Sequence, residues 1–270
     1  MCVVTREGGA ALDLSVLRAP RPTRRTSSER RRARRRAGAP RRGSQRTQPV
    51  LDVLDPAGSW QGGGGYVNGV FVSAGGNGQA RYSLDNGATW QQSYVGVSTH
   101  RRSLATGDDR VLALGDAVEG GSYASVTLDG ITWESVLIPD MHLCRPSFGN
   151  GVFVATCSTP GEPFHAGRSV DGLSWAPINV FSPDAQIANL GFHNGQFILR
   201  EANAYYTSPD GVTWTLQPFW IPDLVVYRNG LWVGIDGATF YYGSKLNDLF
   251  AVPNVAGFGS RLMAGTKPPP

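Results

Sequence analysis

The stretch Ser83-Leu84-Asp85-Asn86-Gly87-Ala88-Thr89-Trp90 recurs three more times along the chain, and every copy ends in tryptophan. The other copies are Thr127-Leu128-Asp129-Gly130-Ile131-Thr132-Trp133, Ser169-Val170-Asp171-Gly172-Leu173-Ser174-Trp175 and Ser208-Pro209-Asp210-Gly211-Val212-Thr213-Trp214. Successive tryptophans are 43, 42 and 39 residues apart. A nearly constant period in the forties predicts an array of similar units, each burying its apolar face against its neighbours.

A second repeated phrase, an Asn-Gly pair between apolar residues, lies between the tryptophans. Its copies are Asn68-Gly69, Asn150-Gly151, Asn194-Gly195 and Asn229-Gly230, with a weaker one at Gly107-Asp108-Asp109-Arg110. Asn-Gly between apolar runs predicts a type I′ hairpin turn, in which both central residues have positive φ. The Asp-Gly of the tryptophan phrase is interpreted in the same way. Each unit is therefore expected to contain two hairpins, or four short strands.

Four antiparallel strands in about forty residues are typical of a β-propeller blade, so the expected fold class is all-β, a single propeller. The tryptophan phrase resembles the Asp box, or BNR repeat, of sialidases and other propellers, whose pattern is Ser-x-Asp-x-Gly-x-Thr-Trp. Residues 83–90 match every fixed position, and the other copies lack one residue between Asp and Gly. The resemblance covers roughly residues 50–265 and implies the propeller fold.

The residues at the fixed positions of these boxes are expected to have a structural role. The Asp can accept hydrogen bonds from the N–H groups of the turn, the Gly can take positive φ, and the Trp can pack between blades. Spread around a ring, the aspartates could not converge on one substrate. The residues concerned are Ser83, Asp85, Gly87, Trp90, Asp129, Gly130, Trp133, Asp171, Gly172, Trp175, Asp210, Gly211 and Trp214.

We expect the propeller to occupy residues 48–265, followed by a Pro-rich tail at 266–270. Five complete units are visible, and residues 255–264 and 55–60 resemble the opening and the close of a sixth. A composite sixth blade built from both termini would remove exposed sheet edges, with a five-blade ring as the alternative. The run Gly62-Gly63-Gly64-Gly65 is interpreted as a flexible approach to the first blade.

The first 47 residues form a basic, low-complexity arm. They hold 14 arginines and three acidic residues, a net charge of +11, whereas the remaining residues carry −7. Such a segment buries too little apolar surface to offset its ordering entropy, so we expect it to be disordered. Three interpretations stay open: binding to nucleic acid or another polyanion, docking on an acidic partner, and a mis-assigned start. No apolar stretch follows the charges as in a signal peptide.

The cysteines allow one geometric prediction. If Asn150-Gly151 is a two-residue turn, counting outward places Cys144 directly opposite Cys157, at a non-hydrogen-bonded position within disulfide range. The alternative is that the two are small buried hydrophobic residues. No run of 18 or more apolar residues occurs, so no membrane insertion is expected.

A catalytic centre is not expected. Sialidases carry an Arg-Ile-Pro signature, an arginine triad, a Tyr/Glu pair and an acid/base Asp, whereas the only Arg-Pro here outside the arm is Arg145-Pro146. A Tyr follows a Glu closely at Glu119/Tyr123 and Glu201/Tyr205, but nearness in sequence does not bring two side chains together. Isolated histidines and the lack of Cys-x-x-Cys spacing predict neither a metal nor a cofactor.

Binding is expected on the face formed by the connections between strands 2 and 3 and between strands 4 and 1, here called the long-loop face, because recognition concentrates on long loops of rigid scaffolds. The opposite, tight-turn face carries the Asn-Gly and Asp-box turns. The candidate binding residues are His100, Arg101, Arg102, Glu119, Tyr123, His142, Glu162, His165, Asp184, Phe219 and Trp220. Trp220 would suit stacking on a sugar or anchoring a protein interface, or alternatively a blade-to-blade contact.

The coupling of shortened Asp boxes to Asn-Gly-Val-Phe-Val resembles propellers of phage tails and other virion proteins. That resemblance implies a non-catalytic structural or host-recognition component of a virion. Its expected partners are other virion or surface proteins, glycans, and a polyanion through the arm. The alternatives are a secreted or cell-surface glycan-binding protein and a sialidase-like glycoside hydrolase.

Overall fold

The computed structural model describes residues 3–5, 11–13, 63–139, 141–142, 144–157, 165–178, 187–201, 204–237 and 239–252. These residues form five four-stranded antiparallel sheets and one two-stranded ladder. In each four-stranded sheet the strands pair in chain order, as in an up-and-down propeller blade. The predicted all-β class is confirmed.

The five sheets are numbered as blades 1 to 5. Blade 1 comprises β3 (Gly63–Val67), β4 (Val70–Ala74), β5 (Gln79–Ser83) and β6 (Gln91–Tyr94). Blade 2 comprises β7 (Thr99–Thr106), β8 (Val111–Ala117), β9 (Ser122–Thr127) and β10 (Glu134–Ile138). Blade 3 comprises β11 (Arg145–Gly149), β12 (Val152–Cys157), β13 (His165–Ser169) and β14 (Ala176–Ile178). Blade 4 comprises β15 (Ile187–His193), β16 (Gln196–Glu201), β17 (Tyr205–Ser208) and β18 (Thr215–Gln217), and blade 5 comprises β19 (Leu224–Arg228), β20 (Leu231–Asp236), β21 (Thr239–Lys245) and β22 (Asp248–Val252).

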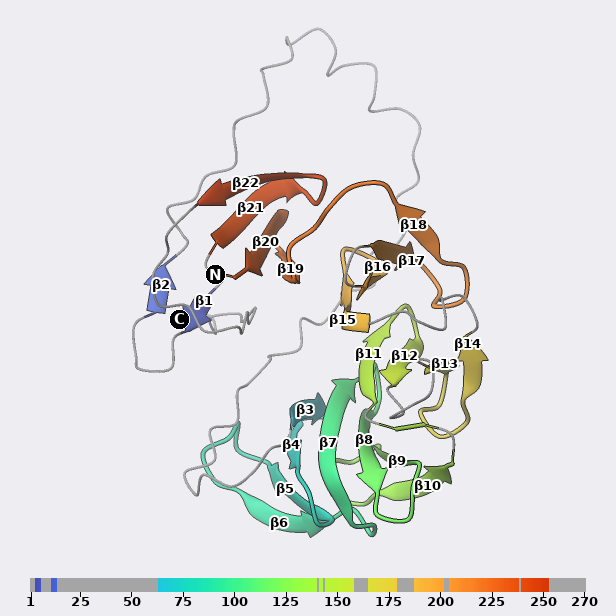
Figure 1. Ribbon diagram of the computed structural model, residues 1–270. Coiled ribbons are helices and arrows are strands. Elements are labelled where there is room, and N and C mark those ends of the chain that lie inside the picture. Colours follow the sequence, from blue (N-terminus) through green and yellow to red (C-terminus); the bar gives the residue numbers. More distant parts are fainter. Residues whose placement is uncertain are drawn as a thin grey trace, which may run out of the picture.

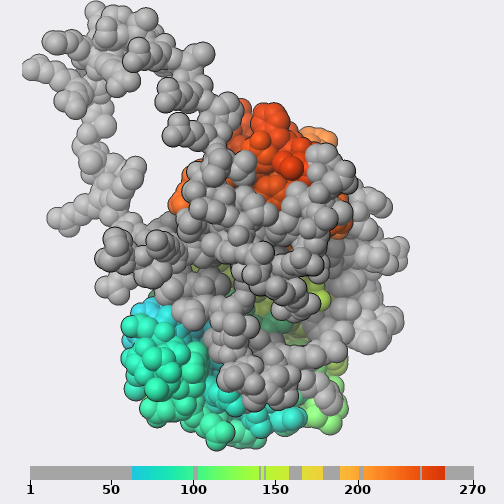
Figure 2. Space-filling model, turned by 90° about the vertical axis from the view of Figure 1, so that its left-hand side faces the viewer, coloured from blue at the N-terminus to red at the C-terminus, as the bar shows by residue number. Residues whose placement is uncertain are grey.

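Successive blades are arranged side by side along an arc (Figure 1). Their first strands contact one another in sequence, β3 with β7, β7 with β11, β11 with β15 and β15 with β19. The first strands therefore line the inner side of the arc. Seen from the side in Figure 2, the colours of blade 1 and blade 5 lie at opposite ends of the face. The proposed sixth blade, at 255–264 and 55–60, lies outside the described residues.

The Asn-Gly turns have the predicted backbone conformation. Asn150 and Gly151 have φ of 49° and 78°, and the other Asn-Gly pairs are similar. The same interpretation of the Asp-Gly turns is wrong, because Gly130, Gly172 and Gly211 have positive φ but the aspartates before them do not. The physical reason is that each Asp side chain accepts hydrogen bonds from N–H groups further along the turn, as in an Asx turn.

The core lies between the blades. Leu112 and Leu114 of β8 and Phe153 of β12 are essentially inaccessible to solvent and belong to the cluster between blades 2 and 3. The glycine run is not a flexible approach, because Gly63 to Gly65 lie in β3. A Cβ on Gly65 would lie 2.8 Å from both methyl groups of Val111, so this inner strand needs glycine to approach blade 2.

Two short strands occur in the arm, which was expected to be disordered throughout. β1 (Val3–Thr5) pairs with β2 (Ala11–Asp13). Val3, Val4 and Thr5 are β-branched and precede the arginine block, which accounts for the local pairing. The rest of the arm and the 266–270 tail lie outside the described residues. Within the described part of the chain there is no helix able to span a membrane.

Blade 3 contains a cross-strand disulfide. β11 and β12 pair in the register expected for a two-residue turn, with Phe148 opposite Phe153. Counting on, Cys144 stands opposite Cys157; the two are joined as a disulfide, and their Cα atoms are 4.0 Å apart. The bridge links the connection that enters blade 3 to the end of its second strand.

Candidate functional site

The tight-turn face is built from the Asp boxes. The carboxylate of Asp171 accepts hydrogen bonds from the N–H groups of Leu173 and Ser174, both at 2.8 Å, and from the Ser169 hydroxyl at 3.0 Å. In turn the N–H of Gly172 donates to Ser169 Oγ at 2.7 Å. The same set of bonds recurs around Asp129 and Asp210. These carboxylates are occupied by their own turns.

The longer first box makes an equivalent set of bonds. Asp85 accepts from the hydroxyl of Thr89 at 2.6 Å, from its N–H at 2.8 Å, and from the Ser83 hydroxyl at 2.8 Å. The Thr89 hydroxyl is the largest of the causes that hold the pKa of Asp85 at about 2. The group is therefore an ionised turn acceptor and is unsuited to act as a general acid near neutral pH.

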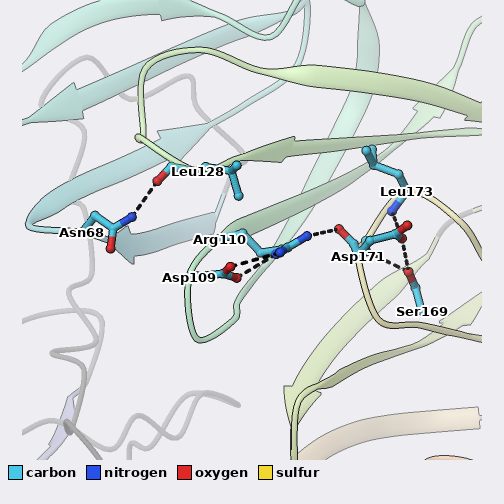
Figure 3. A network of polar contacts seen from close by, with 8 residues as sticks. Asn68, Asp109, Arg110, Leu128, Ser169, Asp171 and Leu173 are labelled. Atoms are coloured by element: carbon cyan, nitrogen blue, oxygen red, sulfur yellow. Dashed lines mark hydrogen bonds and ion pairs between the residues drawn. The ribbon is translucent and has the colours of Figure 1, made fainter.

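Side chains in the first hairpin turns of blades 1, 2 and 3 reach the Asp box of the next blade, as Figure 3 shows for Asn68 and Arg110. Asn68 Nδ2 donates to the carbonyl of Leu128 at 2.9 Å, and Arg110 Nη1 donates to the carbonyl of Asp171 at 3.1 Å. Arg110 is held in place by an ion pair with Asp109, 2.8 Å between Nε and Oδ1. Asn150 Nδ2 donates to the carbonyl of Pro209 at 2.8 Å. These bonds, here called inter-blade clamps, tie blades 1 to 4 together.

The box tryptophans also join blades. Trp133 packs on Val70 and Val72 of blade 1, and Trp175 and Trp214 pack in the clusters formed with blades 2 and 3. The indole N–H of Trp175 donates to the Gly172 carbonyl at 3.0 Å, and Trp90 and Trp214 do the same in their own boxes. The Trp133 N–H is buried and, among the described residues, has no partner.

On the long-loop face, several candidate residues lie elsewhere than expected. His100, Arg101 and Arg102 belong to strand β7, Tyr123 to β9, and His165 to β13, where it pairs with Cys157. The strands are longer than expected because polar residues at their outer ends still pair in the sheet. The side chains of His100, Arg101, Arg102 and His165 are outside the described part, as are Glu162 and Asp184.

Two of the candidates are brought together on blade 2. The Tyr123 hydroxyl donates to Glu119 Oε1 at 2.6 Å. This bond is the main cause that raises the pKa of Tyr123 and lowers that of Glu119. Close by, the N–H of Gly121 lies 3.1 Å from Nε2 of His142. His142 thereby closes the β8–β9 turn onto the connection that follows β10.

Trp220, between β18 and β19, is one of the large aromatic side chains exposed on the long-loop face. Its neighbours point inward: Ile221 is 2% exposed, and Phe219 packs edge-on against Tyr205 with ring centroids 5.0 Å apart. Trp220 is 54% exposed and contacts Tyr241 of β21 in a T-shaped pair at 5.1 Å. The segment is thus fixed on both sides of an outward-facing indole.

One cavity was not anticipated from the sequence. It lies between blades 4 and 5, has a volume of about 450 Å³, and includes His193, Tyr205 and Trp232 in its lining. His193 meets Trp232 edge-on, with ring centroids 6.2 Å apart. Burial lowers the pKa of His193 to about 4, so the imidazole is neutral near pH 7.

Within the described residues, no group of three His, Cys, Asp or Glu side chains is arranged to hold a metal ion. No family model matches the chain, and no curated protein matches it in sequence.

Among solved structures, the chain is similar to Trypanosoma rangeli sialidase in complex with the inhibitor DANA. The identity is 13% and the TM-score 0.48, over 73% of this chain and 48% of the sialidase. It is also similar to YCF48 bound to D1 peptide, with 15% identity and a TM-score of 0.47 over 67% of this chain and 63% of YCF48. A third similar structure is AztD from Citrobacter koseri, with 11% identity and a TM-score of 0.46 over 72% of this chain and 58% of AztD.

The chain thus spans about half the length of the sialidase it matches. The likeness is one of fold alone, that of BNR-like β-propellers.

Proposed function

We propose that this protein is a non-catalytic recognition module of a virion, such as a phage tail, which binds a glycan on the host surface through its long-loop face. The observation that carries the proposal is Trp220, an indole that is 54% exposed although the residues on both sides of it are anchored. Exposing such a ring costs hydrophobic free energy, and a rigidly presented aromatic ring is a typical anchor for a ligand. The virion assignment rests on the style of the repeats alone.

The Asp boxes support a scaffold role. Their carboxylates accept bonds from their own turns, and the clamps use the box carbonyls, so this chemistry maintains the propeller. A rigid scaffold that displays loops at one face suits recognition.

The test applies the full-length chain to a glycan array beside two variants, Trp220→Ala and Phe250→Ala. Phe250 is a matched control because it is 51% exposed on β22 of blade 5, the blade that Trp220 contacts. We expect saturable binding by the native chain, at least tenfold weaker binding by Trp220→Ala, and unchanged binding by Phe250→Ala. Equal binding by all three would contradict the proposal, as would silence on every glycan.

One observation favours a second candidate, a glycoside hydrolase: the 2.6 Å hydrogen bond between Tyr123 and Glu119 resembles a Tyr/Glu pair. The same bond raises the pKa of Tyr123, however, and so keeps the phenol protonated. Sugar released by the native chain and abolished in Tyr123→Phe would establish this second candidate.

A further inference from the structure

The interface between blades 4 and 5 lacks the tryptophan that fills the other interfaces. Gly243 pairs with Trp232 as Ser169 pairs with Phe153. In the next strand the register continues to Leu249 opposite Gly243 and to Trp175 opposite Ser169, so Leu249 of blade 5 stands where Trp175 stands in blade 3. Leu249 and Leu246 pack beside the small cluster at this interface. Leucine is smaller than tryptophan, and the cavity lies at this interface.

The face that blade 4 turns toward blade 5 is also more polar than its counterparts. Gln196 is the residue after the first hairpin turn, a position held by Val70 in blade 1 and Val152 in blade 3. Two strands away, Gln217 Nε2 donates to the Thr207 hydroxyl at 2.8 Å. A missing tryptophan alone would leave an apolar gap, whereas amides here provide donors and acceptors.

The cavity has an aromatic floor and a polar mouth. Tyr205 and Trp232 are buried, at 2% and 5% exposure, while Asn194, Gln196, Ser244 and Lys245 are exposed. These exposed lining residues lie at the tight-turn face, and the lining also includes Phe219, the residue before Trp220. Among the described residues that line the cavity, Lys245 is the one cation and there is no carboxylate.

We propose that this cavity binds a neutral sugar ring. Amide and hydroxyl groups in the lining suit the hydroxyls of a pyranose, and the buried rings of Tyr205 and Trp232 give the cavity an apolar floor. The imidazole of His193 is neutral near pH 7. A volume of about 450 Å³ lies within the range of small-ligand sites, roughly 300 to 1,000 Å³. This proposal does not rest on the glycan site proposed at Trp220, although Phe219, the residue before Trp220, lines the cavity.

The test uses saturation-transfer difference NMR and calorimetry on the full-length chain, with glucose, galactose, mannose and N-acetylglucosamine as probes. Three variants are compared. Gln196→Val installs the residue of blades 1 and 3, and Leu249→Trp restores the missing tryptophan. Phe250→Ala is the control, because Phe250 is 51% exposed on β22 and does not line the cavity. Circular dichroism checks that each variant is folded.

At least one probe is expected to bind the native chain and the Phe250→Ala variant equally. Gln196→Val should weaken that binding roughly tenfold, the effect of losing about one buried hydrogen bond, and Leu249→Trp should abolish it. If the Leu249→Trp variant does not fold, the Gln196→Val variant alone decides whether the proposal stands. No saturable binding by any probe overturns the proposal, as does binding that Gln196→Val leaves unchanged. Binding of free indole in place of every sugar also overturns it, since it would indicate an aromatic side chain as the occupant.

Discussion

Single side chains join the blades of this propeller at defined positions. Asn150 Nδ2 donates to the Gly195 carbonyl at 3.1 Å and to the Pro209 carbonyl at 2.8 Å, both in blade 4. Asn194 occupies the same turn position one blade later, but blade 5 has no Asp box, and no hydrogen bond of the Asn194 amide occurs between described residues. The two asparagines have nearly the same φ, 49° and 52°.

This pair allows a matched test of the inter-blade clamp. Asn150→Gly should lower the free energy of unfolding by about 1–2 kcal/mol more than Asn194→Gly, because two hydrogen bonds are lost in the first variant only. Glycine tolerates positive φ, so neither variant adds backbone strain. Urea unfolding followed by tryptophan fluorescence measures the difference, and equal destabilisation would show that the clamp contributes nothing.

His193 and the box aspartates set the response to acid. The pKa of His193 in the fold is about 4, below its ordinary value of 6.5, so the unfolded chain binds the proton more tightly. The contribution of neutral His193 to the free energy of unfolding is complete above pH 6.5 and is lost as the pH falls toward 4. Asp85, with a pKa of about 2 against 3.8, contributes above pH 3.8 and loses that contribution as the pH falls toward 2.

We therefore expect the free energy of unfolding to fall in two stages, from pH 6.5 to 4 and then from 4 to 2. In a His193→Gln variant the first stage should be smaller, while the second should persist. Urea unfolding at a series of pH values is the measurement. A variant with the same slope as the native chain between pH 6.5 and 4 would show that His193 is not the titrating group.

At the level of strands and turns, close packing between blades depends on the box glycines. A Cβ on Gly172 would lie 2.8 Å from Cγ2 of Val126 in blade 2, and φ there is 83°. Gly151 has a similar φ of 78° but nothing within 4 Å of the same atom. The two positions therefore separate backbone strain from a clash between blades.

Gly151→Ala should destabilise the fold by about 1–2 kcal/mol, the cost of a left-handed conformation for a residue with a side chain. Gly172→Ala should cost about 2–4 kcal/mol, because overpacking is added to that strain. Thermal and urea unfolding of both variants provide the values. Equal losses would mean that the blades yield to an extra methyl group without cost.

Sequence reasoning predicted the elements best where a turn has a local chemical cause. Asn-Gly requires positive φ at both residues, and the structure has it at Asn150 and Gly151. The sequence predicts a connection between blades at the start of β7, because His100, Arg101 and Arg102 lie in a long, variable segment between repeats. Hydrogen bonding to β8 makes this segment a strand, and the polarity of its residues does not indicate that pairing. Only the beginning of β3 is mispredicted, because the reason for its glycines lies in Val111, 46 residues after Gly65.

For the molecule as a whole, the repeat period predicted an all-β array of blades, but the sites depend on departures from the repeat. The interface between blades 4 and 5, where the cavity lies, has Leu249 at a tryptophan position, and the cavity lining has Gln196 at a valine position. Both departures are visible in the sequence once the strand register is known. Only the packing of blade 4 against blade 5 shows that the two departures lie at the same interface.

The disulfide gives a prediction for the whole chain. Because Cys144 and Cys157 are bonded, full-length protein that is purified without reductant and then denatured should expose one thiol, that of Cys2, to Ellman's reagent, and three after reduction. Replacing both bonded cysteines with alanine should lower the free energy of unfolding by about 2–4 kcal/mol. Three thiols before reduction would mean that the bridge does not form in that preparation.

Recognition without catalysis is tested most directly by following one array glycan that the full-length chain retains and measuring the free sugar in the same sample over time. We predict saturable retention that depends on Trp220 and no release of sugar above the rate seen without protein. Release that rises with protein concentration, and is lost in Tyr123→Phe, would contradict the proposal and make the protein a glycosidase.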